Sequence, residues 1–198
     1  MDKTQAEDNI KLIRQIMDRS ARYTSFSGAS GVIAGMLALL GCAATYWIAY
    51  NLSEDRQILP YVLTWVAVLL LALLQDFALA YRKAARHGES LFAPATFQVI
   101  KAVLPGIFVA LVLSIRALTL GELDAIPAIW TLGYGAAVYA AGMYTVREVR
   151  IFGIIQLVTG AVGLFFFSQF DYSLYLLAVS FGLYHIVYGL WMTRKYGW

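Results

Sequence analysis

Six long runs of mostly apolar residues follow one another along this chain, and short polar segments separate them. The runs cover residues 26–50, 59–81, 97–118, 126–144, 151–170 and 172–192. About 20 apolar residues in a helix cross the hydrocarbon core of a membrane. Helices are the only spanning option for such runs, because every backbone amide must be satisfied inside its own segment. The sequence therefore predicts an all-α membrane bundle of six transmembrane helices.

The composition excludes most classes of soluble protein. Hydrophobic residues make up 61% of the chain and charged residues only 14%, whereas about 25% of residues are charged in typical soluble domains. The mean hydropathy is +0.68. These values exclude a disordered chain and a typical cytosolic enzyme. The single cysteine, Cys42, excludes a disulfide scaffold.

Residues 1–23 form a separate segment of mixed charge. Apolar residues recur every three or four positions at Ile10, Ile13, Met17 and Ala21, which is the period of an amphipathic helix. We expect this helix to lie on the membrane surface or against the bundle, and an unstructured tail is the alternative. The chain thus divides into a cytoplasmic or interfacial amphipathic segment, residues 1–23, and a six-helix transmembrane domain, residues 24–198.

Basic residues are distributed unevenly between the two sides of the predicted bundle. All lysines and arginines except Arg56 and Arg116 fall on the side that holds the N-terminal segment and the C-terminus. Lysine and arginine concentrate in cytoplasmic loops, so both termini are expected in the cytoplasm. The excess of positive charge fits the anionic lipids of the inner leaflet rather than nucleic acid. Membrane lipids are therefore the expected partners.

Three polar side chains, those of Asp76, Gln156 and His185, lie at a similar predicted depth in the cytoplasmic half of the spans. A charged side chain inside a span costs about 2.5–3.5 kcal/mol on insertion scales, so Asp76 is expected to face the bundle, pair with a cation or titrate. Lys101 lies at the rim of this layer. The pattern predicts a cytoplasm-facing polar site for a ligand, a proton or a cation. The alternatives are a structural ion pair or interfacial hydration at Asp76, and helix–helix hydrogen bonding by His185.

Glycines recur at helical spacing in the first and last runs, at Gly28, Gly31, Gly35, Gly182 and Gly189. Small residues let helix backbones approach closely in a membrane, where lipid gives no hydrophobic drive for association. These positions predict a helix-packing face. That face would lie either inside one bundle or between this chain and a second copy or a partner membrane subunit.

Motifs for known chemistry are missing from the sequence. No cluster of His, Cys, Asp and Glu has the spacing of metal ligands. No phosphate loop, dinucleotide fingerprint or nucleophile elbow occurs either. We therefore expect no metal, no cofactor and no assigned catalytic residue, and an enzyme is the less favoured reading.

Short motifs near both ends of the chain resemble a family of small uncharacterised bacterial six-helix membrane proteins. The motifs are Ile13-Arg14 followed by Met17-x-Arg19-Ser20, then Tyr23-Thr24-x-x-Ser27-Gly28-x-x-Gly31, Gly182-x-x-His185-Ile186-x-x-Gly189 and Arg194-Lys195-Tyr196-Gly197. The resemblance implies a multi-pass protein of the bacterial inner (cytoplasmic) membrane. It implies no reaction, because no activity is established for the family.

Three functions fit these features. The first is a transporter-like or small-ligand- or lipid-binding membrane protein that uses the polar site. The second is a non-catalytic accessory or regulatory subunit that assembles through the glycine-rich helix faces. The third is a membrane enzyme acting on a lipid or a quinone-like substrate, with His185 as base and Asp76 orienting it.

Overall fold

The computed structural model describes residues 28–87, 94–166 and 170–196, together with residues 5, 9, 10 and 13. Within these ranges the chain forms helices and short turns, and no strand. The elements are α2 (Gly28–Asn51), α3 (Glu54–His87), α4 (Pro94–Leu120), the 3-10 turn η1 (Leu123–Ala125), α5 (Ile126–Ala141), α6 (Arg147–Phe166), α7 (Phe170–Leu177), the π-helical turn η2 (Ala178–Leu183) and α8 (Tyr184–Tyr196). The prediction of an all-α fold is confirmed for these residues.

Five helical segments are long and apolar enough to cross a membrane, judged by length and composition. They are residues 28–51, 55–86, 94–120, 147–166 and 172–196. The sixth run predicted from the sequence, residues 126–144, is shorter in the structure, because α5 ends at Ala141 after 16 residues. Its length is about 24 Å at 1.5 Å per residue, against about 30 Å for a hydrocarbon core. The helix ends there because the chain turns tightly into α6. A Cβ added at Gly142 in this turn would lie 2.7 Å from the Cα of Arg150.

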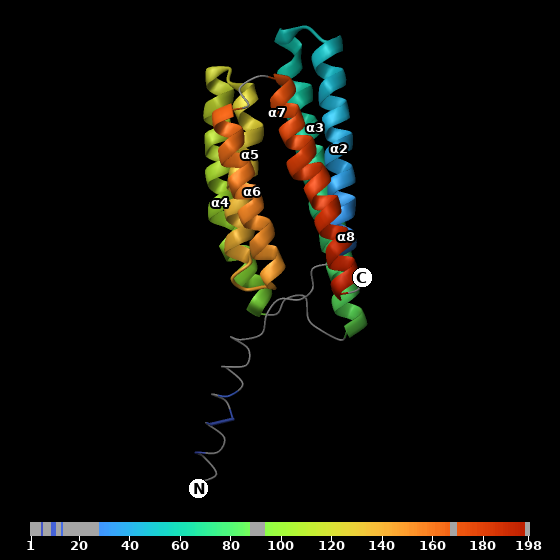
Figure 1. Cartoon of the computed structure of the whole chain (residues 1–198), viewed down its shortest axis with the longest axis vertical. Helices are drawn as coiled ribbons and strands as arrows, with labels where there is room; N and C mark the ends of the chain where they lie inside the picture. The colour runs from blue at the N-terminus through green and yellow to red at the C-terminus, as the bar shows by residue number, and fades with distance from the viewer. Residues whose placement is uncertain are drawn as a thin grey trace.

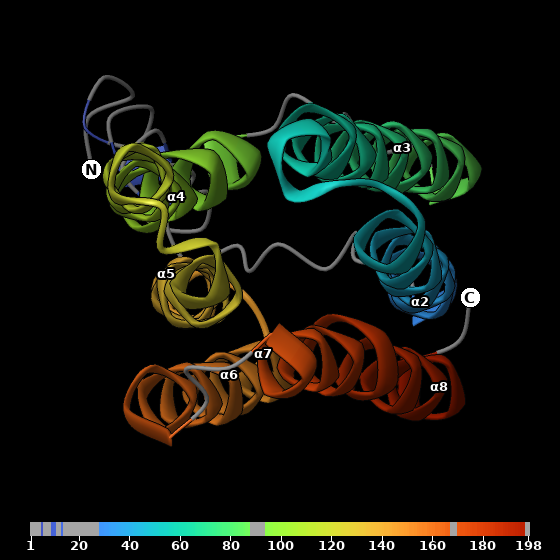
Figure 2. The same ribbon diagram turned by 90° about the horizontal axis from the view of Figure 1, so that it is seen from above.

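Consecutive long helices run in alternating directions (Figure 1). Seen from above, they form two groups of three: α3, α2 and α8 on one side, and α4, α5 and α6 on the other (Figure 2). The C-terminal helical segment, made of α7, η2 and α8, connects the two groups. Its first part, α7, packs against α5, and its last part, α8, packs against α2. The interior between the two groups is therefore lined on one side by α5 and α6 and on the other by η2 and α8.

Glycines bring the backbone of α2 close to the backbones of η2 and α8. A Cβ added at Gly35 would lie 2.6 Å from the carbonyl oxygen of Gly182, and one at Gly189 would lie 2.5 Å from the carbonyl oxygen of Gly28. A Cβ at Gly31 would lie 3.1 Å from the Cα of Gly189. The glycine face identified in the sequence thus lies within the chain, along the contact that we call the α2–α8 seam.

The second group of helices is packed in the same way. A Cβ added at Gly106 on α4 would lie 2.7 Å from the carbonyl oxygen of Gly133 on α5. On α6, a Cβ at Gly153 would lie 2.7 Å from the Cα of Tyr139 on α5. Because both groups are held by small residues, their bulkier polar side chains are left to meet between the groups.

The predicted amphipathic helix over residues 1–23 lies outside the described residues, apart from Gln5, Asn9, Ile10 and Ile13. These four residues are helical and exposed.

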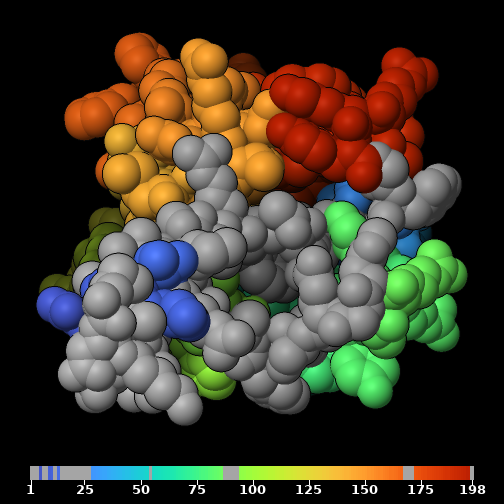
Figure 3. Space-filling model, turned by 90° about the horizontal axis from the view of Figure 1, so that it is seen from below, coloured from blue at the N-terminus to red at the C-terminus, as the bar shows by residue number. Residues whose placement is uncertain are grey.

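Charged side chains distinguish the two ends of the bundle. The end where α2 begins and α8 finishes, the basic end, holds all the described lysines and arginines except Arg56 and Arg116. Figure 3 views the molecule from this end, where α6 (orange) and α8 (red) lie side by side. Lys195 on α8 pairs there with Glu148 on α6. The helix directions therefore produce the charge asymmetry that the sequence pattern indicates.

Replacing Gly35 with leucine should destabilise the protein by about 1–3 kcal/mol, the usual cost of overpacking a tight contact. The new side chain would have to displace the backbone of Gly182. Ala43→Leu adds an apolar side chain at an exposed position of the same helix and should leave stability nearly unchanged. Thermal unfolding of both variants in mild detergent measures the difference, and equal melting temperatures would contradict a tight α2–α8 seam.

Candidate functional site

The π-helical turn η2 places Ser180 at the centre of a buried polar cluster. The carbonyl oxygen of Ser180 accepts hydrogen bonds from Nε2 of Gln156 (2.9 Å) and from Nδ1 of His185 (3.1 Å). The hydroxyl of Ser180 lies 3.2 Å from that of Thr131 on α5. π-Helical turns are rare and frequently occur at functional sites. We call these residues, together with Tyr134, the Ser180 cluster.

The two ring nitrogens of His185 have different partners. Nδ1 faces the carbonyl of Ser180, which can only accept, so Nδ1 carries the proton. Nε2 is then the acceptor, and the hydroxyl of Tyr134 donates to it over 2.9 Å. The rings of Phe152 and Phe181 pack on the imidazole, with centroids 4.9 and 5.7 Å away. These contacts hold His185 in one orientation and one tautomer.

Gln156 on α6 is fully buried and only partly satisfied. Its amide nitrogen donates to Ser180, but its Oε1 atom has no hydrogen-bond partner among the described residues. A buried acceptor left without a partner costs about 1–3 kcal/mol. The oxygen of Gln156 is therefore a place where the cluster can accept a hydrogen bond from a further group.

Asp76 lies on α3, in the same group of helices as His185 on α8. It lies half-buried on α3 and accepts a hydrogen bond from the side chain of Ser30 on α2. It is close enough to Tyr134 for an electrostatic interaction. Gly31, the residue after Ser30, packs beside the carbonyl of His185. Asp76 and His185 therefore lie at one level of the bundle, on either side of α2.

The structure brings some of the sequence-predicted site residues together and leaves one apart. Gln156 and His185 share the Ser180 carbonyl, and Asp76 lies within electrostatic range of Tyr134, which is bonded to His185. Lys101 is exposed on α4. The base-and-orienter pair of His185 and Asp76 expected for an enzyme is not formed, because Ser180 and Tyr134 occupy the two ring nitrogens.

Sequence reasoning missed Ser180, Thr131 and Tyr134. Residues five apart, such as Ser180 and His185, do not share a face of an α-helix, so only the wider π-turn lets them bond. Thr131 and Tyr134 do have helical i, i+3 spacing in the run of α5. That spacing was the one available signal for a polar stripe on α5.

Aromatic and ionic contacts lie between the cluster and the basic end. Phe152 stacks on Tyr188, with ring centroids 4.4 Å apart. Nearer the end of the bundle, Lys195 donates a hydrogen bond to the nearly buried carboxylate of Glu148. Both contacts join α6 to α8, so they connect the two groups of helices beside the cluster.

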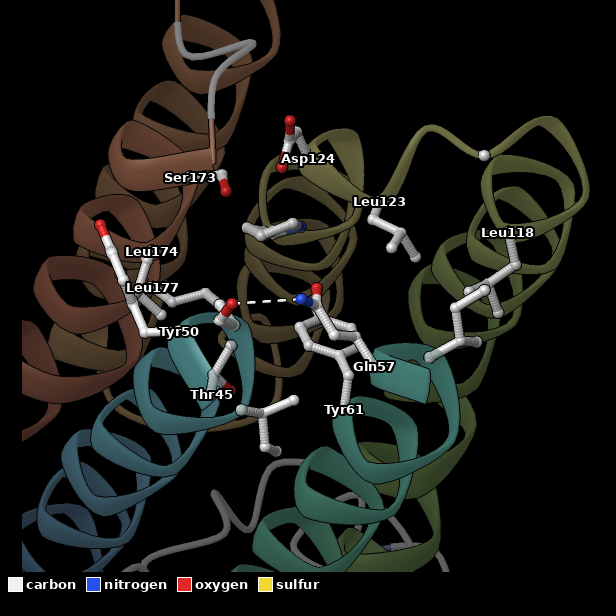
Figure 4. A pocket seen from close by; sticks show the side chains of 15 residues that line it. Thr45, Tyr50, Gln57, Tyr61, Leu118, Leu123, Asp124, Ser173, Leu174 and Leu177 are labelled. Atoms are coloured by element: carbon white, nitrogen blue, oxygen red, sulfur yellow. Dashed lines mark hydrogen bonds between the residues drawn. The ribbon is translucent and has the colours of Figure 1, made fainter. Parts of the chain in front are cut away.

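A cavity of about 480 Å³ lies at the opposite end of the bundle (Figure 4). Its lining comes from the end of α2, the start of α3, the end of α4, the turn with η1, the start of α5 and α7. The polar lining residues are Thr45, Tyr50, Gln57, Tyr61, Asp124 and Ser173. No single run of sequence contains this set, so pattern analysis could not identify the cavity.

Asp124 is the acidic residue of this cavity. Partial burial raises the pKa of its carboxyl above the usual value. Tyr61 is close enough to interact with it electrostatically. Asp124 belongs to neither of the ion pairs that the described ranges contain.

Comparison with known proteins identifies no relative: no family model, curated protein or solved structure matches the chain. The resemblance to an uncharacterised bacterial family therefore stays a prediction from short motifs.

His185 should be observed as the Nδ1–H tautomer, with Nε2 unprotonated, in ¹⁵N spectra of the histidine ring. Tyr134→Phe should shift the Nε2 resonance and lower stability by about 0.6 kcal/mol and at most about 1.7, the range for hydrogen bonds between membrane helices. Tyr175→Phe removes a hydroxyl from an exposed ring and should change neither quantity. An Nε2–H signal in the unmodified protein would contradict the assigned hydrogen bonds.

Proposed function

We propose that this chain is a six-span integral membrane protein that binds a small polar ligand at the Ser180 cluster, in the manner of a transporter. The observation that carries the proposal is the unpaired Oε1 of Gln156, fully buried beside the Ser180 carbonyl. Buried polar groups inside a membrane bundle are costly and usually functional. A ligand that donates a hydrogen bond would satisfy this oxygen.

The ligand that fits is rich in hydrogen-bond donors. Gln156 offers a carbonyl oxygen and Asp76 a carboxylate, and both accept hydrogen bonds. Asp76 supplies the ionisable group, which suits a protonated amine, a cation or a coupled proton. Lys101, exposed on α4 toward the basic end, is proposed as a residue at the entrance from the cytoplasm.

The proposed topology adds α5 to the five longer spans. α5 lies between α4 and α6 in sequence and packs against both. A helix enclosed by protein on two sides does not have to match the full thickness of the lipid. With six spans, the basic end faces the cytoplasm by the positive-inside rule, and the bacterial inner membrane is the proposed location.

A second candidate function, an accessory or regulatory membrane subunit, is favoured by the surface of α3. The most apolar 18-residue stretch of α3 contains no buried residue. A partner subunit or a second copy could cover this face as well as lipid could. The glycine faces are less suited to such a partner, because α8 already packs against the glycines of α2.

Single cysteines introduced into a Cys42→Ala background should report six spans. Glu122 and Arg147 flank α5, and both are exposed. An impermeant maleimide added to intact cells should label Glu122→Cys, and should label Arg147→Cys and Arg86→Cys only after permeabilisation. Labelling of Glu122→Cys and Arg147→Cys from the same side would show that α5 does not cross the membrane.

Native mass spectrometry in mild detergent should detect a small molecule bound to the protein. Asp76→Asn should reduce its occupancy about tenfold, equivalent to ~1.4 kcal/mol, because the charged acceptor is lost. Asp55→Asn removes the same charge at an exposed position near the start of α3 and should retain the molecule. The absence of any adduct, together with a complex of several chains, would favour the subunit function instead.

A further inference from the structure

We propose that the cavity lined by Asp124 is a second binding site, specific for a small organic cation of the quaternary ammonium type. It lies opposite the basic end of the bundle and next to the Ser180 cluster, since Pro127 in its lining accepts a hydrogen bond from Thr131. The inference does not depend on the function proposed for that cluster.

The size and construction of the cavity suit a small molecule. Its volume of about 480 Å³ falls in the range of roughly 300–1,000 Å³ typical of ligand pockets. Nε2 of Gln57 donates to the carbonyls of Ala49 (3.1 Å) and Leu52 (2.8 Å), so it fixes the end of α2 (dashed line for Ala49 in Figure 4). On the next turns of the same helices, Nε1 of Trp65 donates to the hydroxyl of Thr45 over 3.1 Å. These hydrogen bonds between α3 and the end of α2 hold the walls of the cavity in place.

The charge of the cavity selects a cation. Asp124 is the only charged residue among those that line it. In Figure 4, Asp124 and Ser173 lie at one end of the cavity, and Thr45 and Tyr61 lie at the other. An anion would meet the unpaired carboxylate of Asp124 without any basic side chain in the lining to offset the repulsion.

The remaining lining favours an organic cation over a metal ion. Tyr50 and Tyr61 are the aromatic residues among those that line the cavity, and aromatic rings attract ammonium groups. Leu174 and Leu177 supply apolar surface for methyl groups. A metal ion would need several hard or nitrogen ligands, and the described part of the chain holds no group of three His, Cys, Asp or Glu residues suited to one.

Thermal unfolding of the full-length protein in mild detergent tests the site, with tetramethylammonium chloride as the probe and sodium chloride at equal concentration as the reference. A cation that binds only the folded state raises the melting temperature by mass action. Tetramethylammonium should raise it in a saturable manner, and sodium should not. Equal shifts with both salts, or no shift with either, would overturn the proposal.

Two variants assign the effect to the cavity. Asp124→Asn should weaken the apparent affinity for tetramethylammonium at least tenfold, whereas Glu122→Gln should not change it. Glu122 is in the same turn and carries the same charge, but it does not line the cavity. Ala49→Leu fills the cavity without changing any charge and should also abolish the shift, which provides an answer even if Asp124→Asn does not fold. Retention of the tetramethylammonium shift in a folded Asp124→Asn or Ala49→Leu protein would overturn the proposal.

Discussion

Direct contact between helix backbones at glycines is the constraint on which the rest of this structure depends. Lipid gives helices no hydrophobic reason to associate, so close packing has to supply the attraction. Gly28, Gly35 and Gly189 supply it between α2 and α8, and Gly106 and Gly133 between α4 and α5. Because the flat glycine faces are used within each group of three helices, the polar side chains remain for the interior between the groups. The Ser180 cluster is the result.

The cluster differs from an ordinary structural network in one respect. Ser180, Thr131 and His185 satisfy one another, as expected for polar groups buried in an apolar bundle. The Oε1 atom of Gln156 does not find a partner among the described residues. Asp76 lies within electrostatic range of Tyr134. The network therefore keeps one open acceptor, and this oxygen is the observation on which the proposed ligand site rests.

The fold class could be predicted from the sequence because each apolar run carries its own signal of length and composition. The early end of α5 could not be predicted from the sequence, since it depends on the tight contact of Gly142 with α6. For the site, the residue types and approximate depth of Gln156 and His185 could be read from the chain. Their shared partner, Ser180, could not be identified from the sequence, because its position requires a π-turn that breaks the helical period. The cavity at Asp124 could not be predicted from a sequence pattern, because six elements contribute to it.

The π-turn also accommodates one extra residue in the last helical segment. Its i to i+5 hydrogen bonds make the turn one residue wider than a turn of α-helix, so loss of one residue within Ala178–Leu183 would restore the α-helical period there. Tyr184–Tyr196 would then keep the face that packs on α2, including the contact of Gly189 with Gly28. The five-residue spacing on which the bond between Ser180 and His185 depends would be lost, so a single deletion in evolution would change the site while leaving the packing in place.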